Sequence, residues 1–113
     1  MEGYSKRQEK VSRLIQKEIA NIFVKESLLF DNAMITVTVV RTSPDLSFCK
    51  VYLSIFSPGK DSNVIIEAIQ KQKKNLRYAL AKRVKNQLKQ IPELAFFLDD
   101  SLDYIDNIDN LLH

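Results

Sequence analysis

The first quarter of the chain repeats its apolar residues at helical spacing. At about 100° per residue they gather on one side of a helix, namely Val11, Leu14, Ile15, Ile19, Ile22 and Phe23. The opposite side carries a nearly straight basic stripe of Lys6, Lys10, Arg13 and Lys17. Ser5 is a suitable N-cap, although a lysine follows it in the first turn. The pattern predicts an amphipathic helix from about residue 5 to residue 24.

Two runs with period two come next and predict a β-hairpin. In residues 35–39 β-branched apolar residues alternate with threonines, and residues 48–55 alternate again. Between them Ser43-Pro44-Asp45 has the chemistry of a turn, and Ser57-Pro58-Gly59 ends the second run. Cys49 lies on the apolar face, where we expect a small buried hydrophobe rather than a nucleophile. Phe48 and Tyr52 lie on the other face, and we expect them to pack against helices.

The second half of the chain predicts two helices and one strand. Asp61 or Ser62 can cap a helix that runs through Ile69, and the six polar residues 70–75 then interrupt the apolar pattern. The apolar pattern resumes at every fourth residue, at Leu76, Leu80, Val84 and Leu88. At this spacing the apolar side of an unbroken helix would drift by about 40° per step. We therefore expect a bend near 70–75 and a later helix that Ile91-Pro92 ends. Residues 94–98 are nearly all apolar and predict a strand inside a sheet, with Leu94 and Phe96 in the core.

The order is helix, strand, strand, helix, helix, strand, which predicts an α+β fold. With 113 residues and no linker or repeat, we expect one domain over 1–113, with a core at about 5–99. Residues 100–113 form an acidic tail that is hard to assign to a helix or a strand.

Charge is distributed unevenly along the chain. Residues 1–92 hold all 17 basic residues against 8 acidic ones, whereas residues 93–113 hold 6 acidic residues and no Lys or Arg. The strongest window, 71–89, contains no acid and eight basic residues, which are Lys71, Lys73, Lys74, Arg77, Lys82, Arg83, Lys85 and Lys89. A helix that tolerates such self-repulsion favours an anionic partner, although a solvated basic surface without function is the alternative.

Several function classes are disfavoured. One cysteine cannot form an internal disulfide, which favours a reducing cytoplasm, and the start of the chain has no apolar signal region. The only histidine is the last residue, which is a poor place for a catalytic base or a zinc ligand. The spacing of Asp100, Asp103, Asp106 and Asp109 lacks the order of a calcium loop. We therefore expect a protein that is not an enzyme, with no metal, no cofactor and no small-molecule substrate. Membrane binding by the first helix is disfavoured, because its apolar side is needed for the core.

Four motifs in collinear order resemble the ribosome-binding factor A family. They are Ser43-Pro44-Asp45-Leu46, Lys50-Val51-Tyr52-Leu53, Leu76-Arg77 and Pro92-Glu93-Leu94-x-Phe96-x-x-Asp99-x-Ser101. The resemblance covers about residues 6–112. It implies a KH-like fold of the second type, which is a three-stranded sheet with helices on one face. It also implies a monomeric bacterial assembly factor, associated with growth in the cold. Such a factor binds the free small (30S) ribosomal subunit and assists late maturation and processing of 16S ribosomal RNA.

The resemblance has departures at the second helix junction. The family usually bends there at Ala-x-Gly, where this chain has Gln72-Lys73-Lys74, and the interval from Arg77 to Pro92 is about two residues longer. Lys89 replaces the arginine usual three residues before Pro-Glu-Leu, which keeps the charge and loses the bidentate fork. Like its relatives the chain lacks a Gly-x-x-Gly loop, so that basic side chains meeting RNA phosphates become the expected mode of recognition.

We expect the RNA-binding surface to consist of the stripe of the first helix and the basic residues of 71–89. These are Lys6, Lys10, Arg13, Lys17, Lys71, Lys73, Lys74, Arg77, Lys82, Arg83, Lys85 and Lys89. Two alternatives stay open, a general KH-like RNA-binding module and a protein-interaction module that docks through its acidic tail. The tail could also fold back on the basic helices as an RNA mimic.

Overall fold

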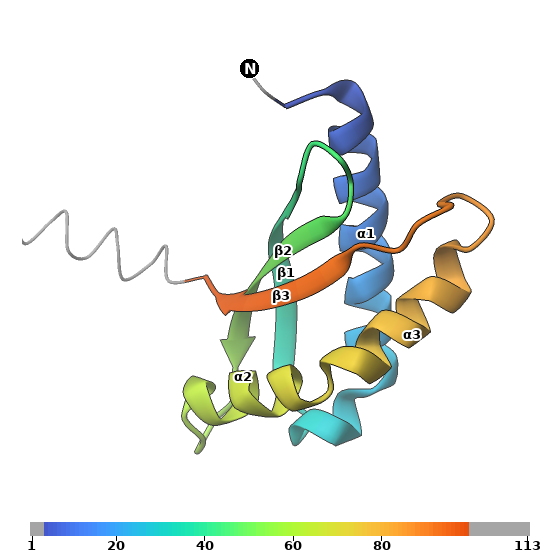
Figure 1. Cartoon of the computed structure of the whole chain (residues 1–113). Coiled ribbons are helices and arrows are strands. Elements are labelled where there is room, and N and C mark those ends of the chain that lie inside the picture. The colour runs from blue at the N-terminus through green and yellow to red at the C-terminus, as the bar shows by residue number, and fades with distance from the viewer. Residues whose placement is uncertain (1–3, 100–113) are drawn as a thin grey trace, which may run out of the picture.

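The computed structural model of the chain describes residues 4–99. In chain order the elements are α1 (Lys6–Lys25), a 3-10 turn η1 (Ser27–Phe30), β1 (Met34–Thr42), β2 (Phe48–Phe56), α2 (Ser62–Lys71), α3 (Lys73–Val84) and β3 (Glu93–Leu98) (Figure 1). This order confirms the predicted α+β fold. The predicted acidic tail, residues 100–113, lies outside the described residues.

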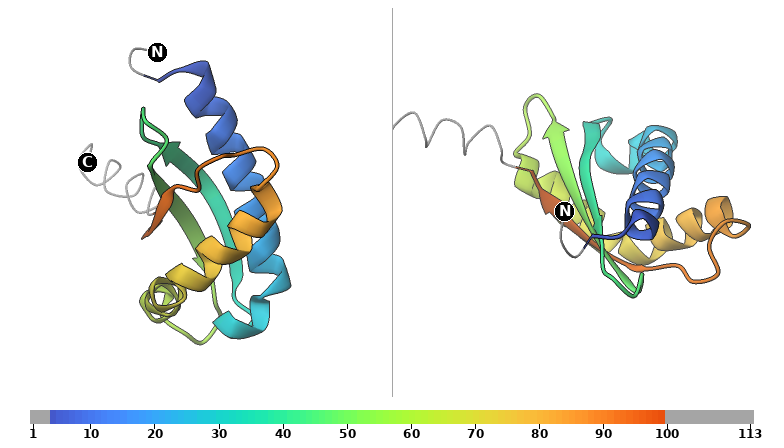
Figure 2. Two further views of the ribbon diagram at one scale, coloured as in Figure 1. Left: turned by 45° about the vertical axis from the view of Figure 1, so that its right-hand side comes forward. Right: turned by 90° about the horizontal axis from the view of Figure 1, so that it is seen from above.

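The sheet is mixed and has β2 at its centre. β1 pairs with β2 antiparallel, and β3 pairs with β2 parallel after the crossover through α2 and α3. A β-bulge between Val37 and Val39 leaves Thr38 as an extra residue on β1. α1 packs along β1, α2 packs against β3, and the views of Figure 2 show α1 and α3 on the same side of the sheet. The helices therefore cover one face, as expected.

Helix α1 is fixed at its start by Ser5, the predicted N-cap, and by three polar side chains that were not predicted. The hydroxyl of Ser5 accepts from the Gln8 backbone N–H, and the Gln8 side chain accepts from the Ser5 N–H, which together form a capping box. The Gln8 amide also donates to the Thr42 carbonyl at 2.9 Å, and the hydroxyls of Ser12 and Thr42 are 2.7 Å apart. These buried polar contacts join the start of α1 to the end of β1.

The core lies between the sheet and the three helices. The rings of Phe23 and Phe30 meet edge to face at 5.7 Å, and Phe23 meets Phe96 at 6.1 Å. Leu94 and Phe96 are buried, as predicted, and Cys49 is completely buried on the apolar face of the hairpin. Burial raises the pKa of the Cys49 thiol to about 11, which keeps it protonated and unreactive at neutral pH.

The predicted break between the second and third helices is confirmed. Gln72 alone separates α2 from α3, and its N–H still bonds to the carbonyls of Ala68 and Ile69. Its backbone angles are φ −94° and ψ 11°, which need no glycine. The chain therefore turns here without the family's usual Ala-x-Gly.

The prediction that the third helix continues to Ile91 is wrong. α3 ends at Val84, and the N–H groups of Gln87 and Leu88 both bond back to the Val84 carbonyl in a turn. Leu88 still packs against the core, but it does so from this turn and not from the helix. Lys85 and Lys89 therefore belong to the loop before β3 and not to a helix.

Two further expectations about the sheet are wrong. β3 is an edge strand and not an interior one. Only the side of β3 that faces the helices is buried, with Leu94 and Phe96, whereas Phe97 on the other side is 41% exposed. Phe48 and Tyr52 do not pack against the helices of residues 4–99, because these helices lie on the other face, where Cys49 and Val51 point. The Tyr52 ring instead stacks on Phe97, with 5.5 Å between their centroids.

Candidate nucleic-acid interface

The basic stripe of α1 exists as predicted. Lys6, Lys10, Arg13 and Lys17 are all exposed and follow one another at spacings of three and four residues, which places them on one side of the helix. Arg13 donates to Glu9 at 2.6 Å, one turn earlier, in an exposed ion pair. The stripe therefore presents three lysines that pair with no carboxylate of the described part of the chain.

A cleft of about 650 Å³ connects this stripe to the loop after α3. Lys10 from α1 and Lys89 from the loop both line it, and so does Arg7, which sequence reasoning missed. The apolar floor comes from Val11, Leu14, Leu46 and Leu88, with Pro44 and Asp45 of the hairpin turn on another wall. The fold therefore brings together basic residues from the two ends of the chain.

Asp45 is the one carboxylate among the residues that line this cleft, and it is engaged in the hairpin turn. It accepts hydrogen bonds from the Ser43 hydroxyl at 2.8 Å, the Ser47 hydroxyl at 2.7 Å and the Ser47 N–H at 3.1 Å. These bonds, that of the Ser47 hydroxyl above all, lower the pKa of Asp45 from 3.8 to about 2. Asp45 thus has a backbone role in the turn, as its sequence context predicted.

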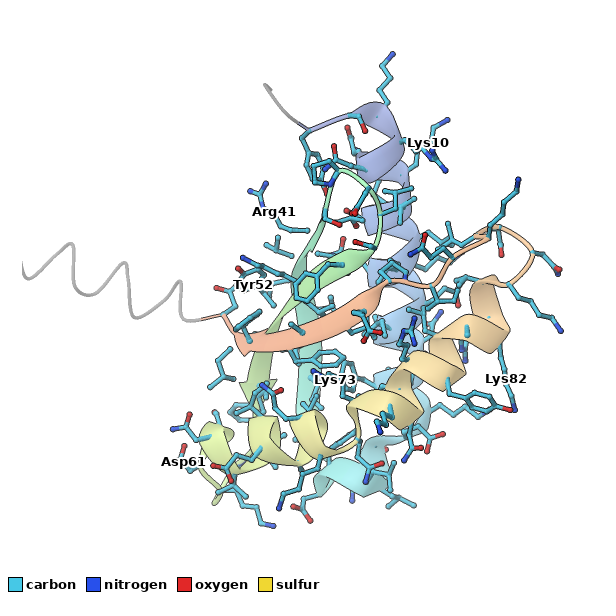
Figure 3. The ribbon with its side chains drawn as sticks, viewed as in Figure 1. Lys10, Arg41, Tyr52, Asp61, Lys73 and Lys82 are labelled. Atoms are coloured by element: carbon cyan, nitrogen blue, oxygen red, sulfur yellow. The ribbon has the colours of Figure 1, made fainter. Side chains whose placement is uncertain are left out.

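A second hollow, of about 520 Å³, lies along α3. Lys73, Lys74 and Arg77 line it together with Tyr78, which sequence reasoning also missed. Tyr78 is 65% exposed, and the Lys82 ammonium lies 4.7 Å from the centre of its ring. Figure 3 shows Lys73 where α2 meets α3, and Lys10 and Lys82 on the right-hand side of the view. Exposed aromatic faces beside cations are typical of RNA-binding grooves.

The two hollows differ in how a helix start contributes to them. The second lies where α3 begins with Lys73 and Lys74, without an acid in the first turn or a side-chain cap. The first lies along the initial turns of α1, whose start is closed by the Ser5 capping box and carries Glu9. The N-terminus of a helix carries a partial positive charge, so the paired lysines at the start of α3 are unfavourable until an anion arrives. The start of α3 is therefore suited to a phosphate group.

Three residues of the predicted set are engaged within the molecule. Arg77 donates to the carbonyls of Pro92 at 3.0 Å and Ile91 at 2.6 Å, and its guanidinium lies 3.7 Å from Glu93. Arg83 pairs with Glu18 of α1 at 3.1 Å, and Arg13 pairs with Glu9. The set's nine lysines make no ion pair with a carboxylate of residues 4–99. Of these, five are exposed and line neither hollow, namely Lys6, Lys17, Lys71, Lys82 and Lys85.

The described residues hold no group of three or more His, Cys, Asp or Glu side chains that could bind a metal ion. No helix among them is long and apolar enough to cross a membrane. Four aspartates whose spacing lacks the order of a calcium loop, Asp100, Asp103, Asp106 and Asp109, lie outside the described residues. The chemistry that residues 4–99 do offer is cationic and aromatic, and it is concentrated on α1, α3 and the loop that follows α3.

The fold and this surface together define a small KH-like α+β domain with basic helices. The chain belongs to the ribosome-binding factor A family, whose model matches residues 7–112. It is 50% identical over 109 residues to ribosome-binding factor A of Cytophaga hutchinsonii, an alignment that covers 96% of this chain and 81% of that protein. It is 40% identical over 106 residues to the factor of Christiangramia forsetii, with 91% and 79% covered.

Solved structures of the same family share the fold. The crystal structure of ribosome-binding factor A from Thermus thermophilus superposes with a TM-score of 0.65 at 25% identity, covering 80% of this chain and 94% of that one. A homology model of a Thermus thermophilus factor, fitted into a cryo-electron microscopy map of its complex with the 30S subunit, gives 0.56 at 26% identity. That alignment covers 82% of this chain and 91% of the other.

Proposed function

We propose that this protein is a ribosome assembly factor that binds the free small ribosomal subunit. In this role it assists late maturation and processing of 16S ribosomal RNA without catalysing a reaction, as a cytoplasmic monomer. The family membership supports the ribosome as partner, and the 30S complex of the Thermus relative supports the small subunit. The site itself supports RNA phosphate as the group that is bound.

The observation that carries the proposal is the state of the lysines. Nine lysines of the predicted surface have no carboxylate partner among residues 4–99, and four of them, Lys10, Lys73, Lys74 and Lys89, line the two hollows. Surface helices normally intersperse both signs of charge. A surface that does not do so favours a polyanion, and such contacts position a protein on RNA by shape and charge rather than by base sequence.

Co-sedimentation with purified small subunits tests the proposal. The full chain should migrate with free subunits at about 0.05 M salt and separate from them at high salt, because released counterions make phosphate contacts salt-sensitive. The variant that combines Lys10→Glu with Lys89→Glu should leave the subunits at a lower salt concentration than the parent. Association that resists both high salt and these two charge reversals would contradict the proposal.

The sequence also left open a protein-interaction module that docks through residues 100–113. Removal of those residues separates the two ideas, because a phosphate-binding surface on α1 and α3 predicts that the truncated chain keeps its subunit association. If the tail instead covers the basic helices as an RNA mimic, the truncated chain should bind more tightly than the full chain.

A further inference from the structure

The face of the sheet opposite the helices carries an aromatic cluster that the helical surface does not use. Along β2, Cys49, Val51 and Leu53 are completely buried under the helices. Because side chains alternate along a strand, Phe48, Lys50 and Tyr52 lie on the other face. Figure 3 shows Arg41 pointing away from α1 on the left of the view, whereas Lys10 lies on the right. Phe48 is 39% exposed there.

The register of the sheet places one aromatic pair at the centre of this face. Tyr52 pairs with Val39 on β1 and with Phe97 on β3. The rings of Tyr52 and Phe97 are stacked, with centroids 5.5 Å apart and planes inclined by 30°. Val39 is 40% exposed and Phe97 is 41% exposed. Three neighbouring strands thus contribute to one apolar row that no described helix covers.

The next row of the same face holds two like charges. Arg41 lies directly opposite Lys50, and Lys50 lies opposite Ala95, whose small side chain leaves the row open towards β3. Arg41 and Lys50 are exposed, and neither makes an ion pair with a carboxylate of residues 4–99. Like charges directly opposite each other destabilise a sheet. An anion bound between them would relieve this repulsion.

Two acidic residues, Glu93 and Asp99, share this face with Phe97 by the alternation of β3, and each has contacts of its own. Glu93 lies opposite Phe48 in the sheet, and its carboxylate is 3.7 Å from the Arg77 guanidinium of α3. Asp99 accepts a hydrogen bond from the Thr38 hydroxyl at 2.5 Å, and its N–H donates to the Leu53 carbonyl at 2.7 Å. The Arg41 guanidinium lies 5.9 Å from the centre of the Tyr4 ring. Glu9 and Arg13 of α1 line the same small hollow as Arg41, and they pair with each other.

We propose that this open face is a second RNA-binding site, which takes an unpaired segment of RNA. One base stacks beside the Tyr52–Phe97 pair, a further base contacts Phe48, and phosphates lie against Arg41 and Lys50. Aromatic residues on a sheet that stack bases next to cations are a general means of binding single-stranded RNA. This inference goes beyond the proposed function, because the face is opposite to the helices that would hold the ribosomal subunit.

Binding of a fluorescently labelled octauridylate to the full chain tests the inference by anisotropy. The variant that combines Tyr52→Leu with Phe97→Leu keeps apolar side chains and removes the rings. It should bind about fivefold to a hundredfold more weakly for each stacked base that is lost. Leu28→Ala, which removes an exposed apolar side chain of η1 that lines neither hollow and is not on this face, is the control and should bind as the parent does.

A second variant keeps the experiment decisive if the double leucine variant does not fold, as checked by circular dichroism. Arg41→Gln with Lys50→Gln leaves the apolar row intact and should lower the salt slope of octauridylate binding by about 1.4, at roughly 0.7 per phosphate on a single strand. Octauridylate binding that is unchanged in a folded double leucine variant, or in the Arg41 and Lys50 variant, overturns the inference.

The other candidate occupant of this face is the acidic tail, residues 100–113, which follows β3. If removal of the tail shifts the nuclear magnetic resonance signals of the Tyr52 and Phe97 rings, and the truncated chain still binds no octauridylate, the face is a docking site for the tail and the inference fails. Subunit co-sedimentation of the Lys10 and Lys89 variant reports on the cleft between α1 and the loop after α3, not on the open face of the sheet. Failure of one proposal is therefore visible while the other stands.

Discussion

The paired lysines at the start of α3 provide a quantitative test of phosphate binding. Lys73 and Lys74 line the same hollow, stand in the first turn of a helix without acidic residues, and have no carboxylate partner among residues 4–99. If each contacts one phosphate, the change of both to glutamine removes two contacts. Glutamine keeps most of the length and the helix propensity of lysine, so that the charge is the main change.

The magnitude follows from counterion release. Each phosphate contact contributes about 0.7 to 0.9 to the slope of log K against log salt. Loss of two contacts should therefore lower the slope by about 1.4 to 1.8. Because the salt-dependent part vanishes near 1 M, the same loss weakens binding by about 25- to 60-fold at 0.1 M salt.

The assay is binding of labelled protein to purified small subunits over a salt series from about 0.05 to 0.3 M, where exposed charges are not yet fully screened. The matched control combines Lys25→Gln and Lys60→Gln, which removes the same charge from exposed sites outside the predicted surface. Lys60 pairs with Asp31 at 2.6 Å, an exposed pair that is worth at most about 1 kcal/mol. If the control lowers the slope as much as the Lys73 and Lys74 variant does, only net charge matters, and the argument from the α3 hollow is refuted.

Three further predictions concern the residues that shape the surface. Arg77→Ala should lower the free energy of unfolding by about 1–3 kcal/mol in urea titrations, since two carbonyls of the loop lose a charged donor. Arg77→Lys should recover only part of the lost stability. An unchanged urea midpoint for Arg77→Ala would contradict this role of Arg77. Asp45 has its pKa lowered from 3.8 to about 2, so its carboxylate stabilises the turn above about pH 4, and this contribution is lost as the pH falls through 2. Amide exchange at Ser47 should accelerate over that range, and Asp45→Asn should remove the pH dependence. Burial raises the pKa of Cys49 to about 11, so iodoacetamide should label the thiol only when the fold opens. Stability should also fall as the pH rises from 9 to 11, because only the unfolded thiol ionises in that range. Rapid labelling of the native protein at pH 7 would refute the burial argument.

The elements that the sequence predicted correctly are those with local causes. The apolar side of α1, its Ser5 cap and the Asp61 cap of α2 are all readable within one or two turns of helix, and the structure has each of them. The break at Gln72 was also local, because six polar residues in a row leave a helix nothing to bury. The family and the KH-like fold followed from four short motifs that stand along this chain in the same order as in the family.

The errors have non-local causes. The end of α3 at Val84 depends on a loop that Arg77 holds by the carbonyls of Ile91 and Pro92, and no local pattern in 85–92 reveals those bonds. The open face of the sheet depends on where the helices pack, since alternation along β2 tells which residues share a face but not which face is covered. The cleft between Lys10 and Lys89 has the same origin, because the two residues meet only after β3 has returned beside β2.

The division between arginine and lysine in the predicted surface has a physical reason. Arg77 and Arg83 join elements to one another, through the loop carbonyls and Glu18 of α1, and Arg13 forms an exposed pair within α1, whereas the lysines of the set pair with no described carboxylate. The planar guanidinium can hold two fixed acceptors at once, as that of Arg77 does, and suits positions that join α1, α3 and the loop. The ammonium is a mobile point charge on a flexible stem, which can follow phosphates whose positions differ between RNA conformations. Replacement of Arg77 and Arg83 should therefore act mainly through stability, and replacement of the lysines through the salt dependence of binding. A lysine variant that unfolds easily but keeps its salt slope would reverse this assignment.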